Sequence, residues 1–268
     1  MSSDVRFEFR KENIDGFLKE LAKEYRKQVG KAMPADLILI GGASVLINYG
    51  FRNMTTDIDA LIHASSAMKE AIRLVGDRHS LPNDWLNSDF RQTDSYSPKL
   101  AEFSVYYKTW SNILTVRTIS AEYLVAMKLR SGRQYKSDLS DVIGILAEHE
   151  KKGAPLRMEQ IEKAVSDLYG SWDQLPESSQ AFIQNVFRDG RFEQLYSQTA
   201  VDEKDTRALL IQFEHTYPDV LKQKNADRVA ENLQKKTNRA SLLASLREMQ
   251  QEAGPDPGRN RRQSRDAR

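Results

Sequence analysis

The sequence predicts an α+β fold in which a small mixed sheet, flanked by helices, is followed by an all-helical C-terminal region. Three observations predict this fold. The apolar run at residues 37–40 ends at two glycines, as a buried strand does before a turn. Residues 57–62 begin with alternating acidic and apolar side chains, which is typical of a strand. After residue 155, apolar side chains recur at helical spacing without strand patterns.

Before residue 150, helical and strand patterns alternate along the chain. The spacing of apolar residues predicts an amphipathic helix over residues 11–30 that ends near Gly30. The next helix, at residues 43–49, follows the two glycines and ends before Gly50, a residue type that commonly closes helices. The other elements predicted here are a helix at 64–74, an irregular stretch at 77–99, strands at 103–107 and 113–118, and helices at 120–130 and 138–149.

The same patterns divide the chain into four parts. Residues 1–150 are expected to form the α/β domain, and residues 151–220 a helical domain that covers the first domain or holds substrate. Residues 221–253 predict one or two amphipathic helices. Residues 254–268 are expected to be a disordered basic tail, whose arginines either attract RNA or DNA or remain solvated.

The composition limits the class of protein. The chain has 268 residues, a formal net charge of +2 and no cysteine, so disulfides and thiolate metal sites are excluded. It contains no apolar run of 18 residues, and its first ten residues are too polar and charged for a signal peptide. We therefore expect a soluble, cytoplasmic protein that does not associate with membranes.

Two acids at the start of the second predicted strand are the first candidate site. Asp57 and Asp59 are two residues apart, so on a strand their side chains lie on one face and Ile58 lies on the other. Neighbouring carboxylates repel each other unless a cation lies between them. Mg²⁺ prefers a few carboxylates together with phosphate oxygens. The pair therefore favours phosphoryl-transfer chemistry, although a single Asp-x-Asp is also common on protein surfaces.

The turn after the first predicted strand is the second candidate site. Gly41 and Gly42 leave backbone N–H groups uncovered at the start of a helix, and Ser44 adds a hydroxyl. Backbone N–H groups and the positive end of the helix dipole bind phosphate. Arg52, in the loop that leads to the acidic strand, either contacts a triphosphate or is solvated.

The order of strand, glycine turn, helix and acidic strand resembles the first motif of the nucleotidyltransferase superfamily with the polymerase-β-like fold. The resemblance implies that the glycine turn holds the phosphates of an NTP and that Asp57 and Asp59 bind Mg²⁺ or Mn²⁺. Members of this superfamily usually carry a third carboxylate on a later strand. We expect Glu102 in this role because it borders a predicted strand, with Asp84 and Asp89 as alternatives.

A second cluster of charges is predicted where two helices meet. Lys128, Arg133 and Lys136 lie near one helix–turn–helix corner, and Asp138 and Asp141 lie three residues apart on one face of the second helix. One interpretation is a salt-bridged corner. The other is that the cations bind phosphate oxygens while an acid positions them or assists a base.

Residues 124–141 resemble the second half of the abortive-infection-type (AbiEii-like) nucleotidyltransferases, which include bacterial toxins. The resemblance implies that Lys128 and either Asp138 or Asp141 are active-site residues. It also implies an acceptor in RNA or protein and, for a toxin, an antitoxin that keeps it silent.

Together these motifs predict an enzyme that moves an NMP group from an NTP to an acceptor hydroxyl and releases pyrophosphate. The acceptor could be a tRNA end, another RNA, a protein hydroxyl or a small molecule. The alternative is a catalytically degenerate protein that keeps the fold and serves as a nucleic-acid or protein binding module. The lack of a clear motif around the third acid favours that alternative.

Overall fold

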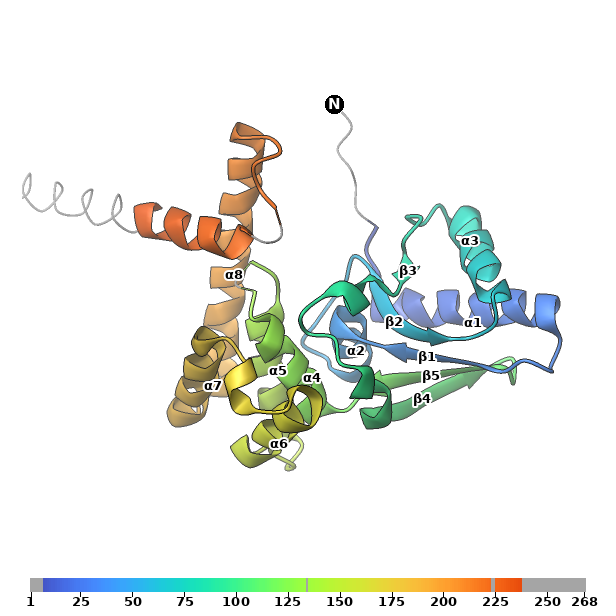
Figure 1. The fold of residues 1–268 in the computed structure, drawn as a ribbon, viewed down its shortest axis with the longest axis horizontal. Helices are drawn as coiled ribbons and strands as arrows, with labels where there is room; N and C mark the ends of the chain where they lie inside the picture. The colour runs from blue at the N-terminus through green and yellow to red at the C-terminus, as the bar shows by residue number, and fades with distance from the viewer. Residues whose placement is uncertain (1–6, 134, 223–224, 238–268) are drawn as a thin grey trace, which may run out of the picture. The chain divides into compact units, whose positions relative to one another are not determined.

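The computed structural model describes residues 7–133, 135–222 and 225–237. Within them the chain forms a five-stranded sheet with the strand order β3-β2-β1-β5-β4 (Figure 1). The pairs β1–β5 and β2–β3 are parallel, whereas β1–β2 and β4–β5 are antiparallel, so the predicted mixed sheet is confirmed. The strands are β1 (Ala35–Leu39), β2 (Ile58–His63), β3 (Leu86–Asn87), β4 (Ser104–Trp110) and β5 (Leu114–Ile119).

Besides a helical stretch at residues 226–237, eight labelled α-helices flank or follow this sheet. They are α1 (Lys11–Val29), α2 (Gly41–Asn48), α3 (Ala67–His79), α4 (Ala121–Ser131), α5 (Asp138–Lys151), α6 (Met158–Tyr169), α7 (Glu177–Asp189) and α8 (Phe192–Thr216), with the 3₁₀-helices η1 (Asp89–Gln92), η2 (Pro98–Phe103) and η3 (Trp172–Gln174).

Most of the predicted elements are confirmed, with differences at their ends. The structure extends α3 to His79 and places β3, η1 and part of η2 in the stretch predicted to be irregular. Within the region 151–220, predicted to be helical, helix α8 begins at Phe192 and runs to Thr216.

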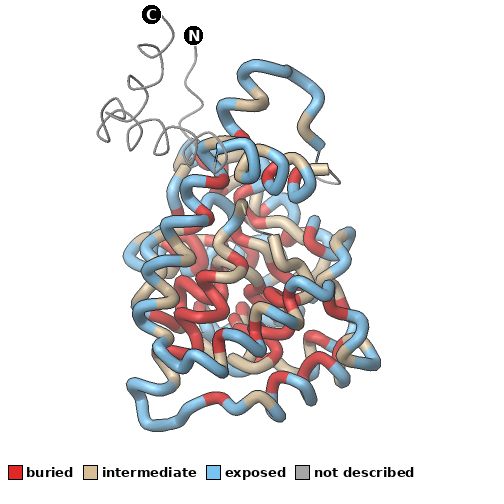
Figure 2. Tube along the Cα trace, turned by 90° about the vertical axis from the view of Figure 1, so that its left-hand side faces the viewer, coloured by how far each residue is buried: buried red, intermediate tan, exposed pale blue. Residues whose placement is uncertain are grey.

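Alternating residues of the central strand enter two different cores. Leu37 and Leu39 pack in one core with residues of α1 and α3, whereas Ile38 and Ile40 pack in a second core with residues of α4 to α7. Figure 2 shows buried segments, coloured red, through the middle of the trace. In β2, Ile58 belongs to the first core and Leu61 to the second. Because side chains alternate along a strand, Asp59 lies on the same face as Leu61.

The second core continues across residue 150. It contains Val142 and Leu146 of α5 together with Ile161 of α6 and Ile183 of α7. The predicted boundary at residue 150 therefore does not divide the core. The chain divides into two units, residues 1–203 and residues 204–268, and the structure describes residues 204–222 and 225–237 of the second.

Part of the C-terminal prediction lies outside the described residues, namely the helices predicted beyond residue 237 and the basic tail at 254–268. In the part of the chain that is described, no helix has both the length and the apolar character needed to cross a bilayer.

Candidate functional site

The glycine turn and the acidic strand meet at one end of the sheet. Strand β1 ends at Leu39, and the N–H of Ile40 then donates to the carbonyl oxygen of Asp59 at 2.9 Å. Gly41 begins α2 with φ +54°, a conformation that side-chain-bearing residues rarely adopt. A Cβ atom at this position would lie 3.7 Å from Asp59 Oδ2. The first residue of α2 is thus in van der Waals reach of the Asp59 carboxylate.

The two acids form a like-charge pair. Asp57 is exposed, whereas Asp59 is half-buried between the sheet and the helices. Burial, followed by the charge of Asp57, raises the pKa of Asp59 to about 6, although Lys136, Arg133 and Lys128 act in the opposite direction. One exposed and one half-buried carboxylate, already in mutual repulsion, match the oxygen donors that Mg²⁺ or Mn²⁺ takes.

Glu102 does not join this pair, contrary to the prediction. It is an exposed residue of η2, which leads into β4, and the strand order places β5 and β1 between β4 and β2. Among the described residues, no group of three or more His, Cys, Asp or Glu side chains is close enough to hold a metal ion. The alternatives Asp84 and Asp89 are therefore not part of a three-acid site either.

The residue next to Asp59 on the adjoining strand is an amide. Strand β3 pairs in parallel with β2, and Asn87 is the register partner of Asp59. The side-chain amide of Asn87 is held by the backbone: its Nδ2 donates to the carbonyl oxygen of Asp84 at 3.0 Å, and its Oδ1 accepts from the N–H of Asp89 at 2.8 Å. The strand position beside the acid pair thus carries a fixed neutral group.

The charges of α4 and α5 form a buried ion-pair network. Lys128 Nζ lies 2.8 Å from Asp138 Oδ1 and 2.9 Å from Asp141 Oδ2. Arg133 Nε lies 2.8 Å from Asp138 Oδ2, and Arg52 pairs with Asp141. Lys128, Asp138 and Asp141 are all at least nine-tenths buried. The arrangement agrees with the first of the two interpretations of these charges, a salt-bridged corner between the two helices.

Electrostatics favour the charged forms of Asp138 and Lys128 in this network. Burial by itself raises the pKa of Asp138, but Lys128 and Arg133 outweigh burial and hold that pKa well below its usual range. Burial likewise acts to lower the pKa of Lys128, and the charges of Asp138 and Asp141 outweigh it and raise that pKa. Lys128 is therefore a charged residue whose ammonium group faces two carboxylates, which fits a structural role better than direct contact with substrate.

Arg52 connects this network to the glycine turn. Its Nε donates to the carbonyl oxygen of Met54 at 3.1 Å, and its Nη1 pairs with Asp141. Its Nη2 lies 2.9 Å from the point that a Cβ atom of Gly42 would occupy. The guanidinium group therefore lies against the first turn of α2 rather than in solvent.

The loop around Arg52 is also held from the helical side. The ring of Phe51 packs on Gly144 of α5, where a Cβ atom would lie 2.6 Å from the ring. Tyr196 of α8 donates its hydroxyl hydrogen to the carbonyl oxygen of Phe51 at 3.1 Å. Sequence analysis did not identify these contacts, although a glycine in the middle of a predicted helix was an available signal.

Glu203 of α8 fixes the start of α5. Its Oε1 accepts from the backbone N–H groups of Leu139, at 2.9 Å, and Ser140, at 3.3 Å. Its Oε2 accepts from the Ser140 hydroxyl. Burial raises the pKa of Glu203 to about 7. The carboxylate caps the helix turn that presents Asp138 and Asp141, a role that the sequence did not suggest.

Two further predicted residues have different surroundings. Lys136 lies close enough to the acid pair for Asp57 and Asp59 to favour its charged form, although desolvation and Arg133 lower its pKa overall. Ser44 is fully buried, and its Oγ accepts from the N–H of Ile119 at 3.3 Å. Ser44 therefore holds α2 against β5, so we leave it out of the phosphate site.

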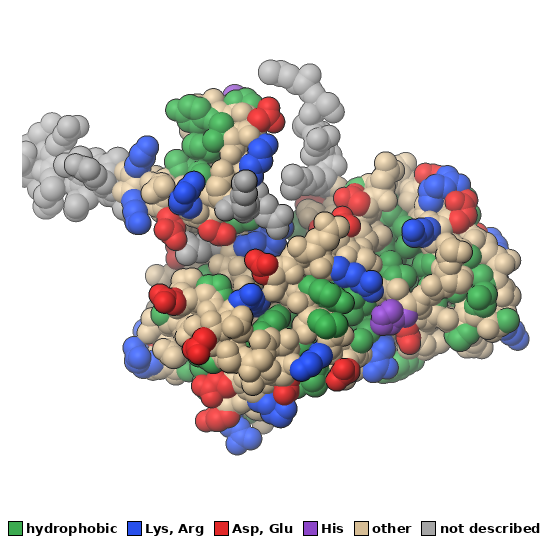
Figure 3. All heavy atoms as spheres, viewed as in Figure 1, with side chains coloured by type: hydrophobic (Ala, Val, Ile, Leu, Met, Phe, Trp, Pro, Cys, Tyr) green, Lys and Arg blue, Asp and Glu red, His purple; other side chains and the backbone are tan. Residues whose placement is uncertain are grey.

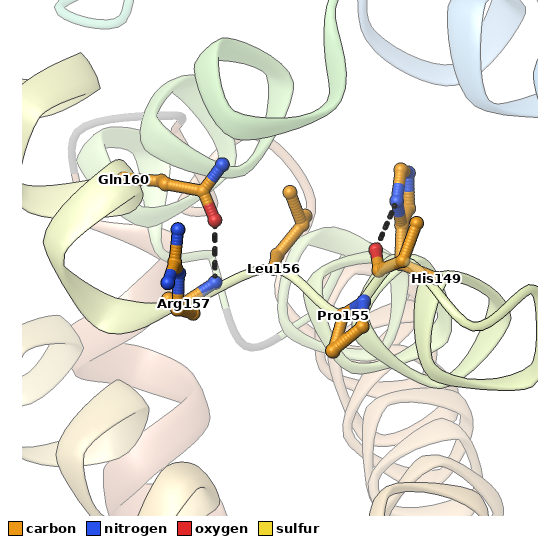
Figure 4. Close-up of a pocket in the computed structure, with 6 residues that line it drawn as sticks. His149, Pro155, Leu156, Arg157 and Gln160 are labelled. Atoms are coloured by element: carbon orange, nitrogen blue, oxygen red, sulfur yellow. Dashed lines mark hydrogen bonds between the residues drawn. The ribbon is translucent and has the colours of Figure 1, made fainter.

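A surface cavity elsewhere in the first unit offers no comparable chemistry. It lies where α5 ends and α6 begins, and Figure 4 shows the side chains that line it. His149 Nδ1 is 3.2 Å from the Ala154 carbonyl oxygen and its Nε2 is 3.3 Å from the Tyr49 hydroxyl. Gln160 accepts from the N–H of Arg157 at 2.9 Å. None of the predicted site residues lines this cavity.

The charges on one face of the molecule do not indicate one particular macromolecular partner. On the face drawn in Figure 3, the described Lys and Arg side chains are interspersed with Asp and Glu side chains. A continuous basic stripe, which is common in nucleic-acid-binding surfaces, is not visible on this face among the residues that the structure describes.

Comparison with known families identifies the part of the chain that holds this site. Residues 16–149 match the sequence model of a family described as "Nucleotidyltransferase of unknown function (DUF6036)". The matched region begins within α1 and ends within α5, so it contains the glycine turn, the acid pair and the ion-pair network. No curated protein and no solved structure matches the chain.

Proposed function

Because the chain belongs to this family of nucleotidyltransferases of unknown function, we propose that it moves an NMP group from an NTP to an acceptor hydroxyl. The observation that carries the proposal is the contact between the glycine turn and the acid pair, since Gly41 adjoins the carboxylate of Asp59. A phosphate-binding turn and a metal-binding acid pair within reach of each other are what such a transfer requires.

Each part of the site has a role in this proposal. Asp57 and Asp59 would hold Mg²⁺ or Mn²⁺, which supplies charge neutralisation at the phosphates and polarises the α-phosphorus. The N–H groups at the start of α2 bind phosphate oxygens. Lys136 and Arg133 stabilise the charge that develops on the leaving pyrophosphate. The acceptor oxygen bonds to the α-phosphorus, the bond to the β-phosphate breaks, and the acceptor proton passes to solvent.

Three buried residues of the ion-pair network, Lys128, Asp138 and Asp141, position these groups without touching the substrate. Lys128 holds Asp138 and Asp141 together, and Asp141 in turn holds Arg52 against the glycine turn. We therefore assign Lys128, Asp138 and Asp141 as positioning residues, in place of the catalytic role that the resemblance implied.

The acceptor is proposed from the sequence resemblance alone. Residues 124–141 resemble abortive-infection-type enzymes, and this extends the proposal to modification of RNA or protein by a toxin that an antitoxin controls.

A second candidate function, a binding module without catalysis, is favoured by one observation. Among the described residues no third acid accompanies Asp57 and Asp59, and the neighbouring strand position is Asn87.

A labelling experiment separates these functions. The protein is incubated with each α-³²P-labelled NTP, Mg²⁺ and cell extract, and the products are treated with ribonuclease or protease. An enzyme is expected to transfer label to a macromolecule that one of the two treatments degrades. If none of the four NTPs transfers label and none binds with Mg²⁺, the nucleic-acid or protein binding module is the better account. If nucleotide binds with Mg²⁺ but no label is transferred, NMP transfer to the acceptors in the extract is excluded.

Substitution of Gly42 by alanine is expected to weaken Mg²⁺-dependent NTP binding by about tenfold. The new Cβ atom would lie 2.7 Å from Thr55 Oγ1 and 2.9 Å from Arg52 Nη2, so both side chains must move away from the turn. Isothermal titration measures the affinity. Gly16→Ala is the matched control because nothing lies within 4 Å of its Cβ position. Equal affinities for the two variants would contradict a phosphate site at this turn.

The affinity for Mg²⁺ is expected to fall as the pH decreases from 7.5 to 5. Asp59, whose pKa is about 6, is ionised above that value and protonated below it, and a proton competes with the metal for the carboxylate.

The stability of the metal-free protein is expected to change with pH in the opposite direction, rising as the pH decreases. Because the pKa of Asp59 is raised on folding, its contribution to stability is complete below about pH 4 and is lost as the pH rises through 6.

Thermal unfolding at several pH values, with and without Mg²⁺, measures both effects. The increase in Tm that Mg²⁺ produces should be largest above pH 7 and small at pH 5. Asp59→Asn should remove this pH dependence. An Mg²⁺ effect on Tm that is equal at pH 5 and pH 7.5 would show that Asp59 is not a ligand.

A further inference from the structure

Two residues of α8 contact the two sides of the Arg52–Asp141 ion pair. The hydroxyl of Tyr196 donates to the carbonyl oxygen of Phe51, the residue directly before Arg52, at 3.1 Å. Glu203 accepts from the N–H groups of the two residues that directly precede Asp141, at 2.9 and 3.3 Å. Residues two helical turns apart lie on one face of a helix, so a single face of α8 makes both contacts.

The tyrosine contact encloses the start of the loop that carries Arg52. The rings of Tyr196 and Phe51 meet edge to face, with centroids 5.3 Å apart and planes 67° apart. On its other side the Phe51 ring packs against Gly144 of α5, where even a Cβ atom would lie 2.6 Å from the ring. A shift of this part of the loop therefore requires α5 or α8 to move.

The glutamate contact replaces a cap that α5 lacks. Ser137, the residue before the helix, makes no capping hydrogen bond with its side chain, so the first N–H groups of α5 need another acceptor. Glu203, which is 4% exposed, accepts from the N–H groups of Leu139 and Ser140 and from the Ser140 hydroxyl. Because the acceptor belongs to a different helix, the position of the α5 start depends on α8.

Both contacts bear on the site through Arg52. Asp141 lies in the turn of α5 that Glu203 holds, and it pairs with Arg52. The Nη2 atom of Arg52 lies 2.9 Å from the point that a Cβ atom of Gly42 would occupy. The tyrosine contact holds the residue directly before Arg52. A displacement at either contact therefore moves the guanidinium group relative to the glycine turn.

We propose that Tyr196 and Glu203 are positioning residues for NTP binding, which hold Arg52 at the glycine turn from the two sides of its ion pair. This inference rests on the proposed function. Both residues act through Arg52 and not by contact with the substrate. The inference also extends the functional part of the chain to α8, which lies beyond the family match at residues 16–149.

Glutamine is a conservative substitute for Glu203. Burial raises the pKa of Glu203 to about 7, so a fraction of this carboxyl group is protonated near neutral pH. Glutamine has the shape of the neutral acid: its amide oxygen can accept from both N–H groups, and its NH₂ group can donate to the Ser140 hydroxyl oxygen. Glu203→Gln is therefore expected to keep the contact, whereas Glu203→Ala removes it.

The test measures the affinity of the full chain for the NTP that binds most tightly, by isothermal titration in the presence of Mg²⁺. Glu203→Ala is expected to bind about fivefold more weakly, because the cap of α5 is lost and less of the protein has Arg52 in place. Tyr196→Phe loses one neutral hydrogen bond and should bind about threefold more weakly. Glu203→Gln should bind as the unmodified protein does.

An Arg52→Met background separates positioning from a general loosening of the fold. Because both residues act through Arg52, neither Glu203→Ala nor Tyr196→Phe should weaken binding further once the guanidinium group is absent. A general loosening would weaken binding in both backgrounds. If Glu203→Ala does not fold, as judged by its thermal unfolding, Tyr196→Phe alone and in the Arg52→Met background provides the same comparison.

Two variants elsewhere in the first unit are matched controls. Tyr169→Phe removes a tyrosine hydroxyl of α6 that also donates to a loop carbonyl oxygen, that of Ser95, at 2.8 Å. Glu24→Ala removes a buried glutamate of α1 that pairs with Lys27 and Arg78. Neither control should change the affinity for NTP.

The inference is overturned if Tyr196→Phe and Glu203→Ala bind NTP as tightly as the unmodified protein. It is also overturned if their losses are as large in the Arg52→Met background, or if the controls lose as much. In these cases the unmodified protein still binds NTP, so the proposed function is unaffected. If the unmodified protein binds no NTP, the proposed function fails and the inference fails with it.

Discussion

Asp59→Asn is expected to reduce nucleotidyl transfer by about 10³-fold or more while the protein remains folded. The half-buried carboxylate adjoins the glycine turn, so its loss removes a metal ligand at the position where the reacting phosphate binds. A bound metal ion supplies several kcal/mol of charge stabilisation, and a loss of about 4 kcal/mol corresponds to a thousandfold in rate. Initial rates with the labelled NTP measure the effect.

The same substitution should stabilise the metal-free protein by about 1 kcal/mol at pH 8. It replaces a carboxylate that burial and Asp57 both penalise with a neutral group of the same shape. Glu102→Gln is the control, because that exposed acid lies on η2, away from the pair, and should change neither activity nor stability. An Asp59→Asn protein that retained full activity would exclude the acid pair as the metal site.

Lys128→Met is expected to lower the free energy of unfolding by about 3–5 kcal/mol. The substitution leaves the buried carboxylates of Asp138 and Asp141 without the cation that contacts both, and a buried ion pair that loses one partner is strongly destabilising. Urea unfolding measures the loss. Lys163→Met is the control, since its exposed pair with Asp167 should contribute less than about 1 kcal/mol.

A double substitution separates a structural role of Lys128 from a catalytic one. Adding Asp141→Asn to Lys128→Met removes one of the two carboxylates that lost the lysine, so part of the lost stability should return. If Lys128→Met instead abolished activity with no change in the free energy of unfolding, Lys128 would be a catalytic residue, as the sequence resemblance implied.

The acid pair could be predicted from the sequence because the signal is local. Alternation of side chains along a strand places Asp57 and Asp59 opposite Ile58, whatever the neighbouring strands are. The burial of Ile58 and the position of Asp59 on the other face agree with that prediction. The glycine turn was predictable for the same reason, since Gly41 follows directly after the strand.

The predictions that failed depend on long-range contacts. Glu102 borders a strand, as expected, but the order of strands in the sheet places that strand away from β2, and a single sequence does not specify this order. Ser44 follows the glycines as expected, but the direction of α2 turns its hydroxyl towards β5.

The contacts that the sequence did not reveal join groups that lie far apart in the chain. Arg52 pairs with Asp141, and Glu203 caps α5 through Leu139 and Ser140. Each is a charged residue with no local pattern that distinguishes it from a solvated one.

The central claim is that the acid pair and the glycine turn bind one metal–polyphosphate complex. A crystal structure with Mn²⁺ and a non-hydrolysable analogue of the NTP that binds most tightly tests it directly, because anomalous scattering locates the metal. We predict a metal peak between the carboxylates of Asp57 and Asp59, about 2.1 Å from their oxygens, with phosphate oxygens at the first turn of α2 beside Gly42. A metal bound away from both acids, or phosphates bound away from that turn, would contradict the claim.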